Sequence, residues 1–144
     1  IPVLGIKTFF ASDVCSAYRS RQYRASGGFT YPCNTNEDRL MAAKFIQNGY
    51  KIAYDAQASV IHSHNLSFKQ QLRRNKEIGF FLEQHKGDLM GASEYGEGER
   101  LVLSVAKQLL AEGDFGGLAG FFFDCVARIL GNRMGKHAGK ESLR

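Results

Sequence analysis

The sequence predicts an α+β fold, in which the first half forms a short mixed sheet covered by helices and the C-terminal region is helical. Two runs rich in Ile, Val, Tyr and Ala, at 51–54 and 57–62, have the composition of β-strands. Apolar residues recur at helical spacing across 102–110 and 118–130. A length of 144 residues and a hydrophobic content of 44% suit a folded globular chain, which argues against wholesale disorder.

In chain order, residues 12–18 alternate loosely and suit a short strand. Residues 19–26 then predict a short helix that stops at Gly27-Gly28. A second helix is expected to begin near Thr35, because Thr35-x-x-Asp38 approximates a capping box with Asp in place of the usual Glu. Gly49 is suited to ending this helix in a left-handed conformation.

A second capping box, Ser67-x-x-Gln70, predicts a helix of about 18 residues that reaches Lys86. A glycine-rich joint then separates a first part, 1–86, from a helical extension with a basic tail, 87–144; its glycines are Gly87, Gly91, Gly96 and Gly98. The apolar run 115–130 is shorter than the ~20 residues of a membrane span and is interrupted by Asp124 and Arg128. We therefore expect it to form a helix that does not cross a membrane.

Composition limits the class of protein. The net charge of +5 is gathered in clusters that suit anionic partners such as diphosphates or acidic lipid head groups, although solvated surface explains each cluster equally well. The three cysteines follow neither a disulfide nor a zinc pattern, which favours reduced thiols in a cytoplasmic setting. The chain opens with Ile1 and shows no leader, so we expect a processed or excised product.

The strongest candidate for chemistry is the pair Glu37-Asp38 at the start of the second predicted helix. An Asp at this position is commonly a cap, and the helix dipole also keeps it ionised. An ionised carboxylate is what a general base needs. Taken without further context, the residue fits both a structural and a catalytic role.

Three groups of residues in fixed order carry a resemblance to a known family: Gly27-Gly28-Phe29, then Glu37-Asp38, then Gly49-Tyr50 followed by His62. This series resembles the acceptor-side, C-terminal half of family 2 glycosyltransferases, and bacterial rhamnosyltransferases in particular. The resemblance implies that Asp38 is the catalytic base of an inverting transfer, assisted by Glu37. It also implies a GT-A-like, Rossmann-like fold of which this chain lacks the N-terminal nucleotide-binding half.

Other residues gain roles through the same resemblance. His62 and His64 lie two apart on a predicted strand, so both point to one face and can bind a metal ion, or one of them can be a core residue. The family implies a diphosphate or metal role for them. Gln70, Arg73 and Arg74 are similar to the Gln-x-x-Arg-Trp signature of processive synthases, with Arg in place of Trp, which puts processivity in doubt. Arginines at a helix start can hold a diphosphate, or simply be solvated.

The resemblance implies an enzyme that transfers a sugar, with rhamnose favoured, from a nucleotide-activated donor to a lipid-linked or polysaccharide acceptor in surface polysaccharide synthesis. It also implies a divalent metal, Mg²⁺ or Mn²⁺, in the complete enzyme. No Asp-x-Asp occurs in the sequence, so we expect this chain alone to be inactive. An exposed sheet edge is expected to favour a homodimer.

The apolar C-terminal helix with its basic sequel fits either docking on the core or attachment to the inner face of the plasma membrane. A rival hypothesis from another class is a non-enzymatic basic module that binds anionic membrane or nucleic acid. The sequence shows no helix-turn-helix, zinc or RNA-binding signature, so nucleic acid is not an expected partner.

Overall fold

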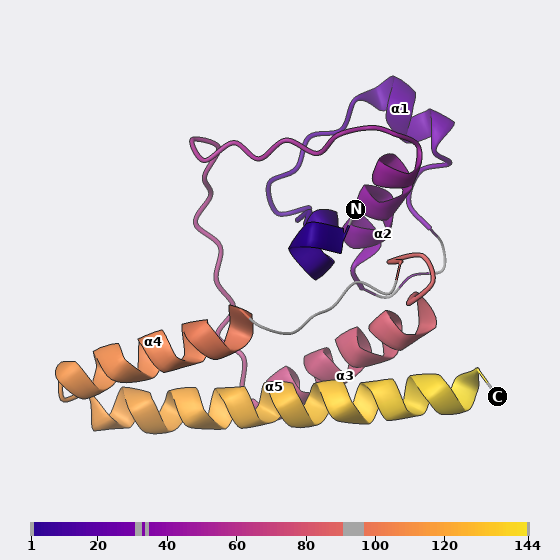
Figure 1. Ribbon diagram of the computed structural model, residues 1–144. Helices are drawn as coiled ribbons and strands as arrows, with labels where there is room; N and C mark the ends of the chain where they lie inside the picture. The colour runs from indigo at the N-terminus through magenta and orange to yellow at the C-terminus, as the bar shows by residue number, and fades with distance from the viewer. Residues whose placement is uncertain (1, 31–32, 34, 91–96, 144) are drawn as a thin grey trace. The chain divides into compact units, whose positions relative to one another are not determined.

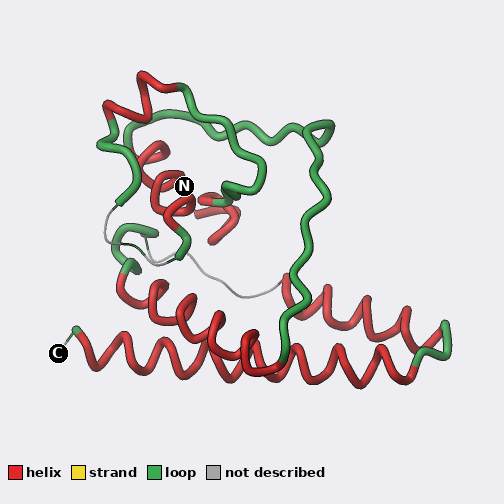
Figure 2. The backbone as a smooth tube through the Cα atoms, turned by 180° about the vertical axis from the view of Figure 1, so that it is seen from behind, coloured by secondary structure: helices red, strands yellow, loops and turns green. Residues whose placement is uncertain are grey.

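The computed structural model describes residues 2–30, 33, 35–90 and 97–143. The chain divides into two units, one made of Ile1–Asn65 with Gln84–Ser93 and the other of Leu66–Glu83 with Glu94–Arg144. The described residues form helices and loops and contain no strand (Figures 1 and 2). The predicted α+β fold with its mixed sheet is therefore wrong. The sheet edge on which the expected homodimer depends is likewise absent from this part of the chain.

The core of the first unit lies where the 3-10 helix η1, Pro2–Phe9, meets the α-helix α2, Glu37–Gln47. Phe9 and Met41 are almost fully buried, and Leu40, Ala42, Ala43 and Leu89 are buried with them. Four consecutive buried residues on α2 show that this helix is covered on most of its circumference near its start. The N-terminal half of α2 is thereby fixed in place, which matters because Asp38 lies on its first turn.

A short helix, α1, Ser20–Ala25, precedes α2 and ends as predicted. Gly27 and Gly28 both have positive φ, 80° and 68°, a conformation that favours glycine. Aromatic rings then join this region to α2: Tyr18 lies 5.9 Å from Tyr23, 5.8 Å from Phe29 and 6.0 Å from Phe45, measured between ring centroids. This aromatic cluster connects the loops of the first unit to the helix.

The predicted strands at 51–54 and 57–62 are extended loop in the structure (Figure 2). All their side chains are exposed, Ile61 fully so. The loop backbone makes two local hydrogen bonds, from Ala58 N to Asp55 O at 3.2 Å and from Ser59 N to Gln57 O at 3.0 Å, and Ala58 O also accepts a weak one from Cys15 Sγ at 4.0 Å. β-propensity expresses packing against neighbouring strands, and these described residues offer no such neighbour.

Residues 12–18, the other predicted strand, form a turn and loop. Cys15 N donates to Ser12 O at 3.0 Å, and the Ser16 hydroxyl donates to the same carbonyl at 2.6 Å. Ser and Asp favour turns because their side chains compete for local backbone groups. The turn residues here outweigh the loose alternation of apolar side chains.

The described residues of the second unit form three helices: α3, Phe68–Gln84; α4, Glu97–Ala111; and α5, Phe115–Ser142. The last residue of α3, Gln84, is assigned to the first unit. The Ser67 capping box is confirmed, since Ser67 N donates to Gln70 Oε1 at 2.9 Å. Gly113, with φ 71°, follows the end of α4. Two glycines of the predicted joint, Gly91 and Gly96, lie outside the described residues, and the boundary after residue 86 stays a prediction.

Helix α5 continues twelve residues beyond the predicted end at Leu130, to Ser142. The reason lies on one face, where Ala127, Gly131, Gly135 and Gly139 recur every fourth residue and are all buried. A Cβ on Gly131 would lie 2.9 Å from Asn75 Cβ, and one on Gly135 would lie 2.7 Å from Phe80 N, so α3 packs directly against this glycine face (Figure 1). Close packing on α3 stabilises a segment that glycine would otherwise weaken as a helix.

Candidate active site around Asp38

Asp38 lies on the first turn of α2 and is half-buried. Its Oδ1 accepts a hydrogen bond from Arg39 N at 2.7 Å, and its Oδ2 accepts one from Asp13 N at 3.2 Å. The capping box predicted from Thr35 is wrong, because Asn36 takes the cap position in a left-handed conformation and its side chain makes no capping hydrogen bond. The carboxylate of Asp38 is instead held between its own helix and a loop.

Burial raises the pKa of Asp38 above its ordinary value, and the negative charges of Asp13 and Glu37 raise it further. The backbone N–H groups of Arg39 and Asp13 act in the opposite direction, because they stabilise the ionised form. A carboxylate with a raised pKa takes a proton more readily than an ordinary one. Each oxygen accepts one N–H, which leaves a lone pair on each for a further donor.

Two residues that the sequence reading did not single out complete this arrangement. The Tyr18 hydroxyl donates to Asp13 Oδ1 at 2.5 Å, and the backbone N–H of Asp13 donates to Asp38. Burial is the first cause that raises the pKa of Tyr18 well above its ordinary value, followed by its bond to Asp13, so the phenol stays protonated and donates. The turn-forming residues Ser12-Asp13 could have indicated this loop from the sequence, but residues 12–18 were predicted to form a strand.

The Gly-Gly-Phe segment lies beside the same helix. Lys44, on α2, donates from Nζ to Gly28 O at 2.8 Å, and Phe29 N donates to the Tyr23 hydroxyl at 3.2 Å. A Cβ on Gly28 would lie 3.4 Å from the Tyr23 ring, so the turn packs closely. Two segments of the series that resembles family 2 glycosyltransferases, Gly27-Gly28-Phe29 and Glu37-Asp38, therefore lie in the same unit, where Lys44 links the first segment to the helix that carries the second.

His62 and His64 lie in the extended loop of the first unit, both exposed. Their rings pack edge to face with centroids 4.3 Å apart. Among the residues that the structure describes, no group of three or more His, Cys, Asp or Glu side chains could hold a metal ion. Two imidazoles alone do not fit Mg²⁺, which prefers oxygen ligands, so we derive no chemical step through a metal here.

Gln70, Arg73 and Arg74 lie on the first turns of α3, in the other unit. Gln70 is engaged in the capping box with Ser67, which gives it a structural role. Arg73 Nε lies 3.3 Å from Glu77 Oε1 in an exposed pair on the same helix, and Arg74 is exposed. A diphosphate role for these residues stays a prediction.

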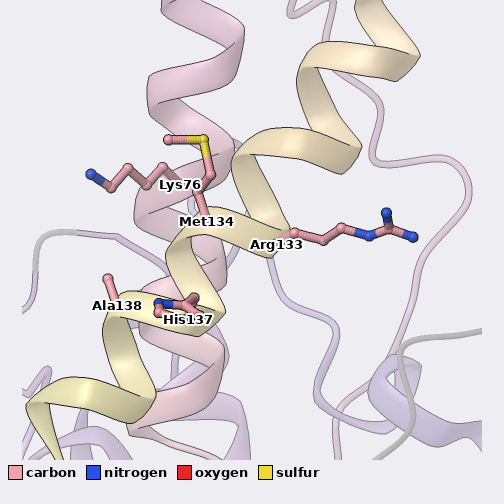
Figure 3. A pocket seen from close by; sticks show the side chains of 5 residues that line it. All are labelled: Lys76, Arg133, Met134, His137 and Ala138. Carbon is pink, nitrogen blue, oxygen red and sulfur yellow. The ribbon is translucent and has the colours of Figure 1, made fainter.

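A shallow hollow of about 430 Å³ lies between α3 and α5 (Figure 3). It is lined by Lys76, Arg133, Met134, His137 and Ala138. In Figure 3 the Lys76 and Arg133 side chains extend to opposite sides. His137 Nδ1 lies 3.6 Å from Glu141 Oε1 on the same helix. Because its cationic groups do not converge on one point, this hollow does not resemble an anion site.

Comparison with known proteins points to one kind of protein. The chain is 42% identical over 137 residues to the O-antigen chain rhamnosyltransferase WbaN of Salmonella anatum, a match that covers 93% of this chain and 42% of that protein. It is 39% identical over 140 residues to the O-antigen chain rhamnosyltransferase RfbN of Salmonella typhimurium, which covers 95% of this chain and 44% of that protein.

No protein-family model matches the chain, and no solved structure matches it. The chain spans less than half the length of the curated relatives that it matches. The resemblance to bacterial rhamnosyltransferases inferred from the motifs is confirmed: over most of its length, this chain is homologous to part of O-antigen chain rhamnosyltransferases.

Proposed function

We propose that this chain is the acceptor-side part of an inverting family 2 glycosyltransferase that acts in surface polysaccharide synthesis. The observation that carries the proposal is its 42% identity, across 93% of its length, to an O-antigen chain rhamnosyltransferase. The half-buried carboxylate of Asp38 at the start of α2 supports it from the structure. Rhamnose is the proposed sugar, carried by a nucleoside diphosphate, and the acceptor is lipid-linked or polysaccharide.

In the proposed reaction, an acceptor hydroxyl attacks the anomeric carbon of the donor sugar from the face opposite the leaving group. Asp38 takes the hydroxyl proton as the new oxygen–carbon bond forms and the bond to the nucleoside diphosphate breaks. Glu37, adjacent on the same turn, assists by hydrogen bonding to the acceptor. Arg73 and Arg74 are proposed to bind the diphosphate, as bidentate donors to phosphate oxygens.

The test is the variant Asp38→Asn in the full-length protein that carries this sequence, assayed with dTDP-rhamnose and a lipid-linked oligosaccharide acceptor. General-base catalysis contributes about 10²–10⁴-fold, so we expect kcat to fall by that order while donor binding is kept. Asp55→Asn is the matched control, since Asp55 lies in the extended loop of the same unit. Near-normal turnover of Asp38→Asn refutes the assignment of the base.

A divalent metal, Mg²⁺ or Mn²⁺, stays part of the proposal for the complete enzyme. The two imidazoles of His62 and His64 do not make a site for such a metal by themselves, so the proposal needs oxygen ligands from elsewhere in the complete enzyme. The same assay tests this: chelation should abolish transfer and added Mn²⁺ or Mg²⁺ should restore it. Transfer that continues at full rate in excess chelator contradicts the metal requirement.

We also propose peripheral attachment of the protein at the inner face of the plasma membrane. None of the helices among the described residues is long and apolar enough to cross a membrane. Phe122 and Phe123 on α5 are 62% and 59% exposed, and basic residues follow them on the same helix. Exposed aromatic rings with cations nearby suit an anionic lipid surface.

Sedimentation with vesicles tests this attachment. The chain should bind phosphatidylglycerol-containing vesicles, be released by high salt, and bind neutral phosphatidylcholine vesicles weakly. Phe122→Ser with Phe123→Ser should weaken binding, while Phe68→Ser, which replaces an exposed phenylalanine on α3, should not. Equal, negligible sedimentation with both vesicle types refutes the proposal.

A further inference from the structure

Asp38 is contacted from outside its own helix by a loop that is itself held in place. The backbone N–H of Asp13 donates to Asp38 Oδ2 across 25 residues of sequence, at 3.2 Å. The side chain of the same Asp13 accepts the Tyr18 hydroxyl. Asp13 is therefore joined to the candidate base through its backbone and to Tyr18 through its carboxylate.

Tyr18 in turn contacts α2, the helix that carries the candidate base. Its ring lies 6.0 Å from the ring of Phe45, which is on α2 seven residues after Asp38. Residues seven apart share one face of an α-helix, so Tyr18 contacts the same face of α2 that Asp38 occupies. Tyr23 and Phe29 pack against the Tyr18 ring from the other segments of the aromatic cluster.

The loop between these contacts is closed by its own hydrogen bonds. Ser12 O accepts from both Cys15 N and the Ser16 hydroxyl, which fixes the turn that presents the Asp13 N–H. One donor on each oxygen of Asp38 restricts rotation of the carboxylate. The remaining lone pairs then keep a constant direction, which a base needs to meet an acceptor hydroxyl.

We infer that Asp13 and Tyr18 are positioning residues for Asp38: Tyr18 holds the Asp13 loop against α2, and the Asp13 N–H orients the carboxylate of the base. This inference rests on the proposed function for its catalytic meaning. The contact chain from Tyr18 through Asp13 to Asp38 carries it, and neither residue is given a direct role in proton transfer.

The test is an NMR titration of this chain, which needs no substrate. In the wild type, the Asp13 amide signal should follow the ionisation of Asp38, because the two groups are hydrogen-bonded. Tyr18→Phe keeps the ring and removes the hydroxyl, and should reduce the amplitude of this titration at least twofold. Tyr54→Phe, at an 85% exposed tyrosine of the same unit, is the matched control and should leave the amplitude unchanged.

Asp13→Ala should act like Tyr18→Phe, and Asp13→Asn should restore the amplitude, since an amide oxygen still accepts the Tyr18 hydroxyl. Asp13 is exposed, so Asp13→Ala carries the test if Tyr18→Phe fails to fold. A full wild-type amplitude in folded Tyr18→Phe or Asp13→Ala overturns the inference. An Asp13 amide that does not report Asp38 in the wild type overturns it too.

An activity measurement separates this inference from the proposed function. If Asp38 is the base, Tyr18→Phe in the full-length protein should lower kcat about tenfold, with KM unchanged within twofold. An inactive wild type with a normal NMR signature refutes the function alone. A normal kcat in Tyr18→Phe, together with a lost signature, shows that orientation does not matter for catalysis and overturns the inference.

Discussion

The two units of this chain are stabilised by different kinds of contact. In the second unit, α3 and α5 meet through backbone atoms, because glycines at every fourth position of α5 leave no side chain between them. In the first unit, loops are held against α2 by aromatic rings and by single hydrogen bonds between a side chain of α2 and the loop backbone. The candidate base lies in the unit held by aromatic rings and single hydrogen bonds.

This difference has a physical meaning for function. Residues in loops fixed by a few polar contacts are adjustable by single substitutions, whereas a helix pair packed on its backbone is not. A catalytic carboxylate needs donors placed around it, and loops supply backbone N–H groups that helices use internally. The candidate base lies in the unit whose loops present such N–H groups.

The largest expected effect is at the glycine face of α5. Gly135→Ala places a methyl group 2.7 Å from Phe80 N and 2.9 Å from Lys76 C, and backbone atoms cannot move aside. We expect the free energy of unfolding to fall by about 1–3 kcal/mol, the usual cost of overpacking. Urea denaturation followed by circular dichroism measures it.

Gly120→Ala is the matched control on the same helix, because a Cβ at Gly120 meets nothing within 4 Å. There the better helix propensity of Ala should raise the free energy of unfolding by up to about 1 kcal/mol. The two identical substitutions are thus expected to have opposite signs. A stabilising Gly135→Ala would show that α3 and α5 do not pack as described.

Helices whose ends depend on neighbouring residues were predictable from sequence. The Ser67-Gln70 box and the left-handed Gly113 are local signals, and both are present in the structure. The sequence also indicates the extension of α5, because Gly131, Gly135 and Gly139 lie four residues apart. Glycine lowers helix propensity, however, and the partner helix is far away in sequence, so the extension was not predicted. The strand predictions at 51–54 and 57–62 were wrong because a strand is stable only when it pairs with a neighbouring strand.

In the candidate site, too, local features were predictable from the sequence and tertiary contacts were not. The position of Glu37 and Asp38 at a helix start followed from local pattern, and the structure has α2 begin at Glu37. The partner of Asp38 is a loop 25 residues away, and no local pattern specifies such a contact. The role of Tyr18 depends on rings brought together by tertiary packing, which a single sequence does not reveal.

A smaller effect should distinguish the two helix starts. Ser67→Ala removes a hydroxyl that belongs to a reciprocal cap with Gln70 and should lower the free energy of unfolding by about 1 kcal/mol. Thr35→Ala, at the start of α2, removes no capping bond, because Asn36 caps that helix without its side chain. There the loss should stay within about 0.5 kcal/mol. Equal losses at both sites contradict the difference between the two helix starts.

The smallest effect on stability, and the most specific on chemistry, is expected from Asp13→Asn. The pKa of Asp38 is raised first by burial and then by the charge of Asp13, so removing that charge should lower the pKa while the backbone N–H bond stays. A raised carboxyl pKa means that the folded state binds the proton more tightly. Its contribution to stability is full below the ordinary value of 3.8 and is lost as the pH rises through the folded pKa. The variant should therefore lose less stability than the wild type across this pH range, with a difference at pH 7 within about 0.5 kcal/mol.

Carboxyl carbon NMR shifts measure the pKa of Asp38, and urea denaturation at several pH values measures the free energy of unfolding. The pKa of Tyr18 should fall as well, because Asp13 helps to raise it. An Asp38 pKa that rises or stays constant in Asp13→Asn would mean that the two carboxylates do not lie as close together as the hydrogen bond from Asp13 N to Asp38 Oδ2 implies.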